Sequence, residues 1–201
     1  MTEDTILAAR VDELERQLAA EVEIRDRLVA IATQLNSTFN LDELLELVLS
    51  AATDLLEAEA GSLMIVDQAK GDLIIELTSG GSDTDVVGRR IPPGQGIAGW
   101  ALEHREPVLV DNPDADPRFF RDVDEATGFT TTDILAVPLL AWDRPVGVLE
   151  LINKLGQGAF TQDDVHLATA FAGIAAIAID NAALYAKLTD AVMTARMSYR
   201  L

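Results

Sequence analysis

Residues 134–152 read ILAVPLLAWDRPVGVLELI. Two short apolar runs, 134–140 and 146–152, flank the turn-forming stretch Trp142-Asp143-Arg144-Pro145. Apolar runs of this length around a short turn are typical of two antiparallel strands that form a hairpin. This hairpin is the first piece of the sheet that we expect.

Three more runs continue the sheet. Residues 62–67 and 72–78 are β-rich and are separated by Gln68-Ala69-Lys70-Gly71, which predicts a second hairpin. Residues 107–110 predict one further strand. The sheet is therefore expected to be largely antiparallel.

A long helix is predicted before the sheet, from Thr5 to about Leu35, because this segment contains neither Gly nor Pro and is rich in Ala, Leu, Glu and Arg. Its apolar residues alternate by four and three in two groups: Leu7, Val11, Leu14 and Leu18, then Ile24, Leu28, Ile31 and Leu35. Such a narrow seam is typical of a coiled coil, although the step from Leu18 to Ile24 is one residue short of a heptad. We expect this helix to form a parallel dimer.

Two other helices have wider apolar faces. One runs from Leu41 to about Glu57 and can be capped by Asn40 or Ser37. The last helix runs from Thr161 to about Leu188, with one side on the sheet and another toward a second subunit. It continues toward Leu201 without a stop signal. The predicted domains are a coiled-coil helix (1–36), a globular domain (37–188) and an output-helix extension (189–201).

Composition narrows the function classes. The chain has 201 residues, a formal net charge of -19, and 15 Lys and Arg residues that form no stripe, so nucleic acid is not an expected partner. It has no cysteine, which excludes disulfides, thiolate metal sites and a nucleophilic Cys. The two histidines lack partners spaced as metal ligands, so no metal is expected. The N-terminus lacks the features of a signal peptide and no apolar run approaches about 20 residues, so we expect a cytoplasmic protein that does not enter a membrane.

Two segments are too rich in Gly, Pro and Asp to be sheet: 91–100 and 111–132. Loops of this size in a compact domain are usually functional. The first leads into a short helix whose backbone amides near Gly96 and Ile97 can hold a phosphate. The second segment is expected to act as a cover over another part of the domain.

The chain resembles the GAF family, and within it the cyclic-nucleotide-binding GAF domains of phosphodiesterases and bacterial adenylyl cyclases. The resemblance covers about Leu41 to Tyr185. The residues that carry it are Ile91-Pro92 with 95–99, Asn112-Pro113-Asp114, 119–124 with Thr127-Gly128-Phe129, Ile134-Leu135 with Pro138, and 147–154. It implies an α/β (α+β) fold with a central, largely antiparallel sheet, helices on one side and a helical lid on the other.

The resemblance also implies a set of nucleotide contacts: Ser62, Thr78, Ser79, Ile97, Ala98, Phe120, Asp124, Thr127, Thr131 and Glu150. Backbone amides at Ile97 and Ala98 suit a cyclic phosphate, and the hydroxyl and carboxyl groups suit a ribose or a purine edge. The alternative is that Asp124, Thr127 and Thr131 are ordinary surface residues and that Glu150 faces solvent.

A signature of the nucleotide-binding members is matched at Asn153, Lys154, Phe160 and Asp164, whereas Val165 occupies the place of its Glu. Family precedent makes the Lys154 and Asp164 pair a latch that braces the pocket. The alternative is that Asn153 and Lys154 only close the strand and Phe160 is a core residue. Cyclic-GMP binders tend to have an aromatic residue and an acid where this chain has Thr78 and Ser79, which favours cyclic AMP.

The resulting hypothesis is a homodimeric, non-enzymatic sensor that binds a cyclic nucleotide, cAMP or cGMP, under a lid formed by residues 94–104 and 114–131. Occupancy would then bias the flanking helices and regulate an effector domain. The rival hypothesis is a GAF fold kept as a dimerisation scaffold, or one that senses another small molecule. The GAF-fold methionine sulfoxide reductases need cysteines, which this chain lacks.

Overall fold

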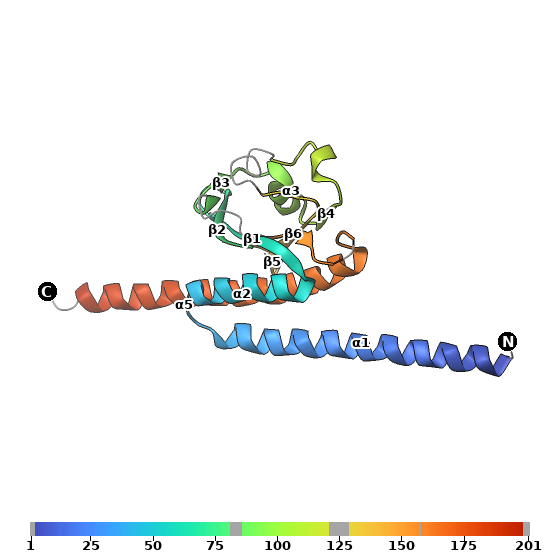
Figure 1. Ribbon diagram of the computed structural model, residues 1–201. Coiled ribbons are helices and arrows are strands. Elements are labelled where there is room, and N and C mark those ends of the chain that lie inside the picture. The colour runs from blue at the N-terminus through green and yellow to red at the C-terminus, as the bar shows by residue number, and fades with distance from the viewer. Residues whose placement is uncertain (1–2, 81–85, 121–128, 157, 199–201) are drawn as a thin grey trace. The chain divides into compact units, whose positions relative to one another are not determined.

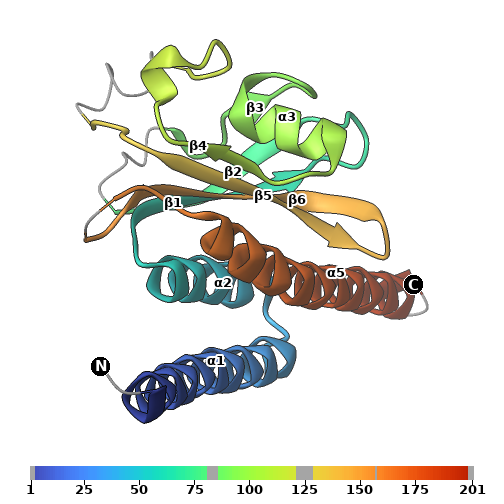
Figure 2. The same ribbon diagram turned by 90° about the vertical axis from the view of Figure 1, so that its right-hand side faces the viewer.

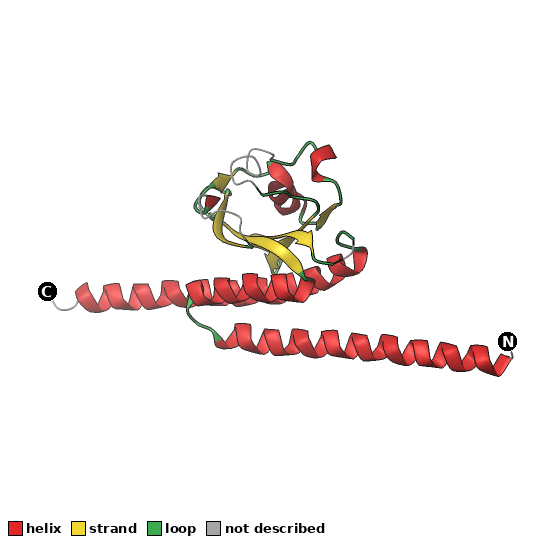
Figure 3. Ribbon diagram, viewed as in Figure 1, coloured by secondary structure: helices red, strands yellow, loops and turns green. Residues whose placement is uncertain are grey.

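The computed structural model describes residues 3–80, 86–120, 129–156 and 158–198. The chain forms two compact units, residues 1–37 and residues 38–201. The first unit is one helix, α1 (Glu3–Ser37), which begins and ends two residues beyond the predicted bounds (Figure 3). Several residues of its predicted seam are exposed, among them Leu7, Leu14 and Leu18.

The second unit is built on a six-stranded antiparallel sheet with the order β3-β2-β1-β6-β5-β4 (Figure 1). The strands are β1 (Ala58–Val66), β2 (Leu73–Ser79), β3 (Arg90–Ile91), β4 (Val108–Val110), β5 (Ile134–Ala141) and β6 (Arg144–Lys154). Both predicted hairpins and the antiparallel sheet are confirmed. β3 was not predicted, because its two residues are too few to show a strand pattern and precede a Gly- and Pro-rich loop.

Two helices cover one face of the sheet, namely α2 (Leu41–Leu56) and α5 (Gln162–Ser198) (Figure 2). α2 begins at Asn40, whose Oδ1 accepts hydrogen bonds from the backbone N–H groups of Asp42 at 2.9 Å and Glu43 at 3.2 Å. α3 (Gly96–His104) and a 3-10 turn, η2 (Pro113–Ala115), lie on the opposite face. This three-layer arrangement confirms the predicted fold class.

The pleat of β6 divides its side chains between the two faces of the sheet. Leu149 and Leu151 are fully buried on the face that carries α2 and α5. Val148 belongs to the apolar cluster on the other face, together with Ile97 and Ala101 of α3. The domain therefore has a helix-packed core on one side of β6 and a separate packed layer, open to a cavity, on the other.

α5 runs past Leu188 into the predicted output-helix extension, as far as Ser198. By length and composition alone its segment 162–196 could cross a membrane, in contrast to the expectation that no run in the chain approaches this length. The reason is that Ala and Ile residues dominate its middle on nearly all faces. Part of this apolar surface packs on the sheet and on α2, where Phe171, Ala175 and Ile179 are buried, so the helix has a core role.

Gly147 is the point of closest approach between β6 and β1. A Cβ atom at this position would lie 2.1 Å from the backbone oxygen of Met64. We predict that Gly147→Ala lowers the free energy of unfolding by about 2–3 kcal/mol, because the two central strands must move apart. Urea denaturation measures the change.

The matched control is Gly173→Ala in α5, where a Cβ atom would meet nothing within 4 Å. Alanine favours a helix over glycine, so this variant should gain about 0.5–1 kcal/mol. Equal stability of the two variants would contradict the close approach at Gly147.

Candidate ligand-binding site

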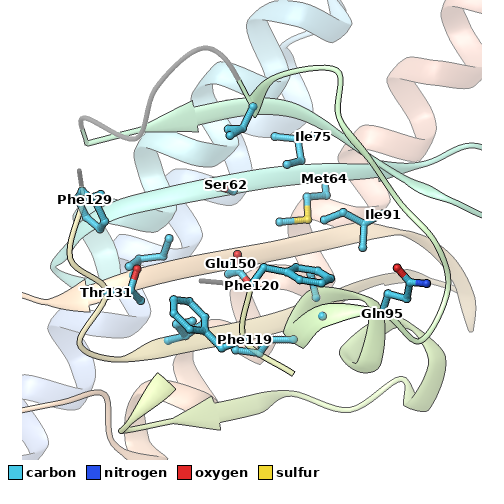
Figure 4. A pocket seen from close by; sticks show the side chains of 16 residues that line it. Ser62, Met64, Ile75, Ile91, Gln95, Phe119, Phe120, Phe129, Thr131 and Glu150 are labelled. Atoms are coloured by element: carbon cyan, nitrogen blue, oxygen red, sulfur yellow. The ribbon is translucent and has the colours of Figure 1, made fainter. Parts of the chain in front are cut away.

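A cavity lies between the sheet, the start of α3 and the segments on either side of residues 121–128 (Figure 4). The space between its lining atoms is about 770 Å³ when the open solvent at its mouth is counted. The described lining residues are Ser62, Met64, Ile75, Val86, Ile91, Gln95, Gly96, Ile97, Ala98, Phe119, Phe120, Phe129, Thr131, Ile134, Glu150 and Ile152. Most of them are apolar.

The floor of the cavity includes Ser62 and Glu150, which are neighbours at the centre of the sheet. Glu150 of β6 pairs in register with Ser62 of β1 on one side and with Ala136 of β5 on the other. Ser62 and Ala136 are both buried. Among the described lining residues, Glu150 is the one with a titratable side chain.

The surroundings of Glu150 change its acidity. Burial raises the pKa of this carboxyl group from 4.5 to about 7, because the charged form loses its hydration. Near neutral pH the group is therefore divided between a carboxylic acid, which can donate a hydrogen bond, and a carboxylate, which only accepts. The predicted orientation of Glu150 toward the pocket matches its position on the floor (Figure 4).

The N-terminus of α3 forms one end of the cavity. The N–H of Gly99 donates to the carbonyl of Gln95 at 3.1 Å, so the amides of Gly96, Ile97 and Ala98 precede the first intrahelical bond. Amides in this position, with the helix dipole behind them, can hold an anionic group. Gly96 has φ +70°, and a Cβ there would lie 2.5 Å from the Phe120 ring, so the glycine permits both the turn and the ring's position.

Three aromatic side chains surround the opening: Phe119, Phe120 and Phe129 (Figure 4). Phe120 remains 40% exposed although it lines the cavity. A large apolar ring that is half exposed at the mouth of a cavity can bury itself against a flat ligand. The arrangement supplies stacking surface, while the floor and α3 supply polar groups.

The cavity brings together six of the ten predicted contact residues, namely Ser62, Ile97, Ala98, Phe120, Thr131 and Glu150. Thr78 and Ser79, at the end of β2, are not among the lining residues, although Thr78 pairs with Ser62 in register. Asp124 and Thr127 lie outside the described residues.

Sequence reasoning missed the other lining residues, of which Gln95, Phe119 and Phe129 have the most distinct chemistry. The sequence contains a signal for the two phenylalanines, because they stand at the two ends of the loop segment 119–129 in a chain that has six Phe. The sequence also contains a signal for Met64 and Ile152, because the alternation of side chains along a strand places them on the same face as Ser62 and Glu150. Among the described residues, no group of three His, Asp or Glu side chains is placed to hold a metal ion.

The residues of the signature motif form a polar network at the end of β6. Lys154 Nζ lies 2.9 Å from Asp164 Oδ1 and donates to the carbonyl of Leu56 at 2.8 Å. Burial raises the pKa of Asp164, but hydrogen bonds from Lys154 and Thr161 outweigh this and hold it below its ordinary value. The Phe160 ring is buried, with its centre 5.9 Å from Lys154 Nζ. Val165 is buried in the core, outside these hydrogen bonds.

Asn153 connects three segments of the chain. Its Oδ1 accepts from the Thr132 N–H at 2.8 Å, and its Nδ2 donates to Glu59 Oε2 and to the Thr130 carbonyl, both at 2.8 Å. Its backbone is left-handed, with φ +58°, which asparagine tolerates better than most residues. The side chain thus fixes residues 130–132, which lead from Phe129 at the cavity into β5.

Comparison with known proteins identifies this fold. Residues 40–180 match the family profile described as GAF domain, which is more than half of the chain. The chain belongs to the GAF domain family.

Its relatives include cyclic-nucleotide enzymes. The chain is 27% identical over 186 residues to a probable 3',5'-cyclic phosphodiesterase, pde-5, of Caenorhabditis elegans, covering 88% of this chain and 25% of that protein. It is 36% identical over 99 residues to the dual 3',5'-cyclic-AMP and -GMP phosphodiesterase 11A of Takifugu rubripes, covering 48% of this chain and 11% of that protein. The chain therefore spans a quarter or less of the length of these relatives.

Solved structures share the fold. The GAF domain of a phosphoenolpyruvate-protein phosphotransferase from Coxiella burnetii superposes with a TM-score of 0.71 at 23% identity, covering 82% of this chain and 96% of that one. Free methionine-R-sulfoxide reductase from Neisseria meningitidis superposes with a TM-score of 0.66 at 20% identity, covering 81% of this chain and 91% of that one. At these identities the likeness concerns the fold alone.

The raised pKa of Glu150 predicts a pH-dependent stability. Because its pKa is about 7 in the folded chain and 4.5 ordinarily, the folded state binds the proton more tightly, and stability is lost as the pH rises through this interval. Glu150→Gln removes this loss. The free energy of unfolding of the variant, relative to that of the wild type, should therefore rise by on the order of 2–3 kcal/mol between pH 4 and pH 8. Urea denaturation of ligand-free protein at both pH values measures it, and parallel profiles would refute the buried carboxyl.

The network around Asn153 predicts a large effect of a small change. Asn153→Asp keeps the acceptor for Thr132 but removes the donor to Thr130 and places a second carboxylate beside Glu59. We expect a loss of about 2–3 kcal/mol in urea denaturation. Asn112→Asp, at an exposed loop position whose side chain makes no capping bond, is the control and should change little. Equal effects at both positions would show that the network does not stabilise the domain.

Proposed function

We propose that this chain is a regulatory sensor domain that binds a cyclic purine nucleotide in the cavity, cyclic AMP in preference to cyclic GMP. The observation that carries the proposal is the combination of three kinds of group around one cavity. These are the amides at the start of α3 that precede its first intrahelical bond, the polar floor of Ser62 and Glu150, and the aromatic mouth. The relationship to 3',5'-cyclic phosphodiesterases supports the same ligand class.

In the proposed complex each part of the nucleotide meets one of these groups. The cyclic phosphate lies at the amides of Ile97 and Ala98, which are the anion-holding end of the cavity. The ribose hydroxyl bonds to Glu150 or Thr131, and the purine stacks on the Phe120 ring. Asp124 and Thr127 remain proposed contacts, by resemblance.

The preference for cyclic AMP follows from the hydrogen-bond donors of the two bases. Guanine carries a ring N–H and an amino group on the same edge, and burying them without acceptors costs free energy. Thr78 and Ser79 supply no carboxylate for that ring N–H, and most described lining residues are apolar. Adenine, which has one amino group, loses less in such a cavity.

Signal transmission is proposed to run through helices. The chain would work as a homodimer in the cytoplasm, with the N-terminal helix and the end of α5 leading to an effector domain in the same or another chain. The domain itself performs no reaction in this proposal, and the thiol chemistry of methionine sulfoxide reductases is unavailable to a chain without cysteine.

A second candidate function is that of a dimerisation scaffold or a sensor of a different, less polar small molecule. The apolar character of most lining residues favours it, as does Val165, which stands where the signature has a Glu. Mass spectrometry of what copurifies with the protein separates these cases, because a scaffold should carry no bound molecule.

Calorimetry with cyclic AMP and cyclic GMP on nucleotide-free protein tests the proposal. Cyclic AMP should bind more tightly, and Thr131→Ala and Ser62→Ala should each weaken it about five- to tenfold, the value of one hydrogen bond. Thr189→Ala, on an exposed part of α5, is the control and should bind as the wild type does. Absence of binding by both nucleotides at about 100 micromolar, the weak end of regulatory affinities, would refute the proposal.

A further inference from the structure

Glu150 has no partner for its carboxyl group. Among the described residues, none forms a hydrogen bond or an ion pair with it, and burial is the one cause of its raised pKa. Buried carboxyl groups ordinarily have such a partner, because an unpaired one loses its hydration without compensation. Figure 4 shows the group among the apolar side chains of the cavity. Its oxygen atoms are thus left for whatever enters this space.

No cation in the described part of the chain faces this carboxyl group. The described lining contains no Lys, Arg or His and no second acid. Basic side chains on the surrounding segments are ion-paired elsewhere, namely Arg90 with Asp67 and Asp72, Arg118 with Asp116, Arg144 with Asp180 and Lys154 with Asp164. Other charged or titratable groups on these segments are also absent from the lining: Glu59, Glu76, Arg89, Glu103, His104 and Asp133. Arg121, Asp122, Asp124 and Glu125 lie outside the described residues.

The acid and the carboxylate forms of Glu150 are therefore close in free energy near neutral pH. The charged form has lost hydration, and no described cation replaces it, so the pKa stands at about 7. At such a pKa, a modest change in the electrostatics of the cavity changes the charge of the group. A ligand that brings its own charge is a change of this kind.

The α3 end of the same cavity favours one negative charge. The amides of Ile97 and Ala98 lie at this end and precede the first intrahelical hydrogen bond. A helix N-terminus carries a partial positive charge of roughly half an elementary charge. This partial charge offsets part of one anionic group on a ligand. It leaves nothing to offset a second negative charge on the floor of the cavity.

We propose that an anionic ligand enters this cavity together with one proton from the solvent, which binds to a carboxylate oxygen of Glu150. The occupied cavity then holds one negative charge instead of two. The inference rests on the proposed function, in which the cyclic nucleotide is the monoanion, and it adds a form of regulation to that site. Occupancy depends on pH as well as on the concentration of the ligand.

The direction of the pH effect follows from the charges. The ligand's negative charge raises the pKa of Glu150 further in the complex, because like charges in a low-dielectric cavity repel each other. The complex therefore binds the proton more tightly than the free protein does. Affinity is complete below a pH of about 7 and falls as the pH rises through this value. The protonated group also donates a hydrogen bond to the ligand, which a carboxylate cannot do.

Calorimetry with cyclic AMP at pH 6 and pH 8 is the first test. The dissociation constant should be roughly five- to tenfold larger at pH 8, the factor expected when one group with a pKa near 7 must be protonated. A cyclic phosphate is a diester without a second acidic proton, so the ligand keeps its charge over this interval. Titrations at pH 8 in two buffers that differ in ionisation enthalpy should show the uptake of close to one proton per ligand.

Glu150→Gln assigns the proton to its residue. The amide is uncharged at both pH values, so this variant should bind cyclic AMP with the same affinity at pH 6 and pH 8, and without proton uptake. His166→Gln is the matched control, because it removes an exposed group on α5 that ordinarily titrates in the same interval. It should keep the pH dependence of the wild type. A pH dependence that persists in Glu150→Gln, or loss of binding by this variant at both pH values, would overturn the proposal.

Infrared difference spectra detect the proton directly. Addition of cyclic AMP at pH 8 should produce the carbonyl band of a protonated carboxyl group in the wild type and in His166→Gln. Glu150→Gln should not show this band. Its absence from wild-type protein that has bound the nucleotide would overturn the proposal.

Failure of this inference and failure of the proposed function give different results. Cyclic AMP that binds equally tightly at pH 6 and pH 8 would overturn the proton uptake and leave the nucleotide site standing. Absence of binding by both nucleotides at both pH values would overturn the proposed function, and this inference with it.

Discussion

The alternating pleat of β6 governs the organisation of the domain. The strand lies between β1 and β5, so both of its edges are hydrogen-bonded and its register is fixed on both sides. Side chains two residues apart must then face the same layer. Leu149 and Leu151 belong to the helix-packed core. Glu150 lies between them in the strand, so its side chain points to the opposite face and lines the cavity. A carboxyl group is placed in an apolar space by the same geometry that buries its neighbours.

The same strand links the cavity to the rest of the domain. Asn153, three residues after Glu150, fixes residues 130–132, and Lys154 joins the start of α5 through Asp164. Under the proposed function, a ligand that moves residues 130–132 or the floor would act on a few adjoining residues of β6. Their hydrogen bonds reach α2 at Leu56 and α5 at Asp164. Residues 150–154 of β6 thus connect the cavity to the long helix α5.

Those parts of the structure that depend on local pattern could be predicted from the sequence. The strands at 134–140 and 146–152, the Asn40 cap and the glycine loop before α3 all have strong short-range signals. The cavity was predictable at Ser62, Thr131 and Glu150, on strand or loop positions matched to a known family. The left-handed backbone of Asn153 and the bonds of its side chain to Glu59 and Thr130 were not, because they depend on contacts far apart in the chain. Thr78 and Ser79 match positions of the family's binding site but are not among the described lining residues. A match to a motif position does not by itself point a side chain toward the cavity.

The length of α5 beyond its last buried core residue has a mechanical consequence. From Ala182 to Ser198 the helix continues for 16 residues, which at 1.5 Å each is a rigid arm of about 24 Å. A tilt of about 5° at the base of this arm displaces its tip by about 2 Å, simply by the ratio of arm length to angle. A tilt of α5 that is too small to break a hydrogen bond at the sheet would therefore be enlarged at the end of the helix.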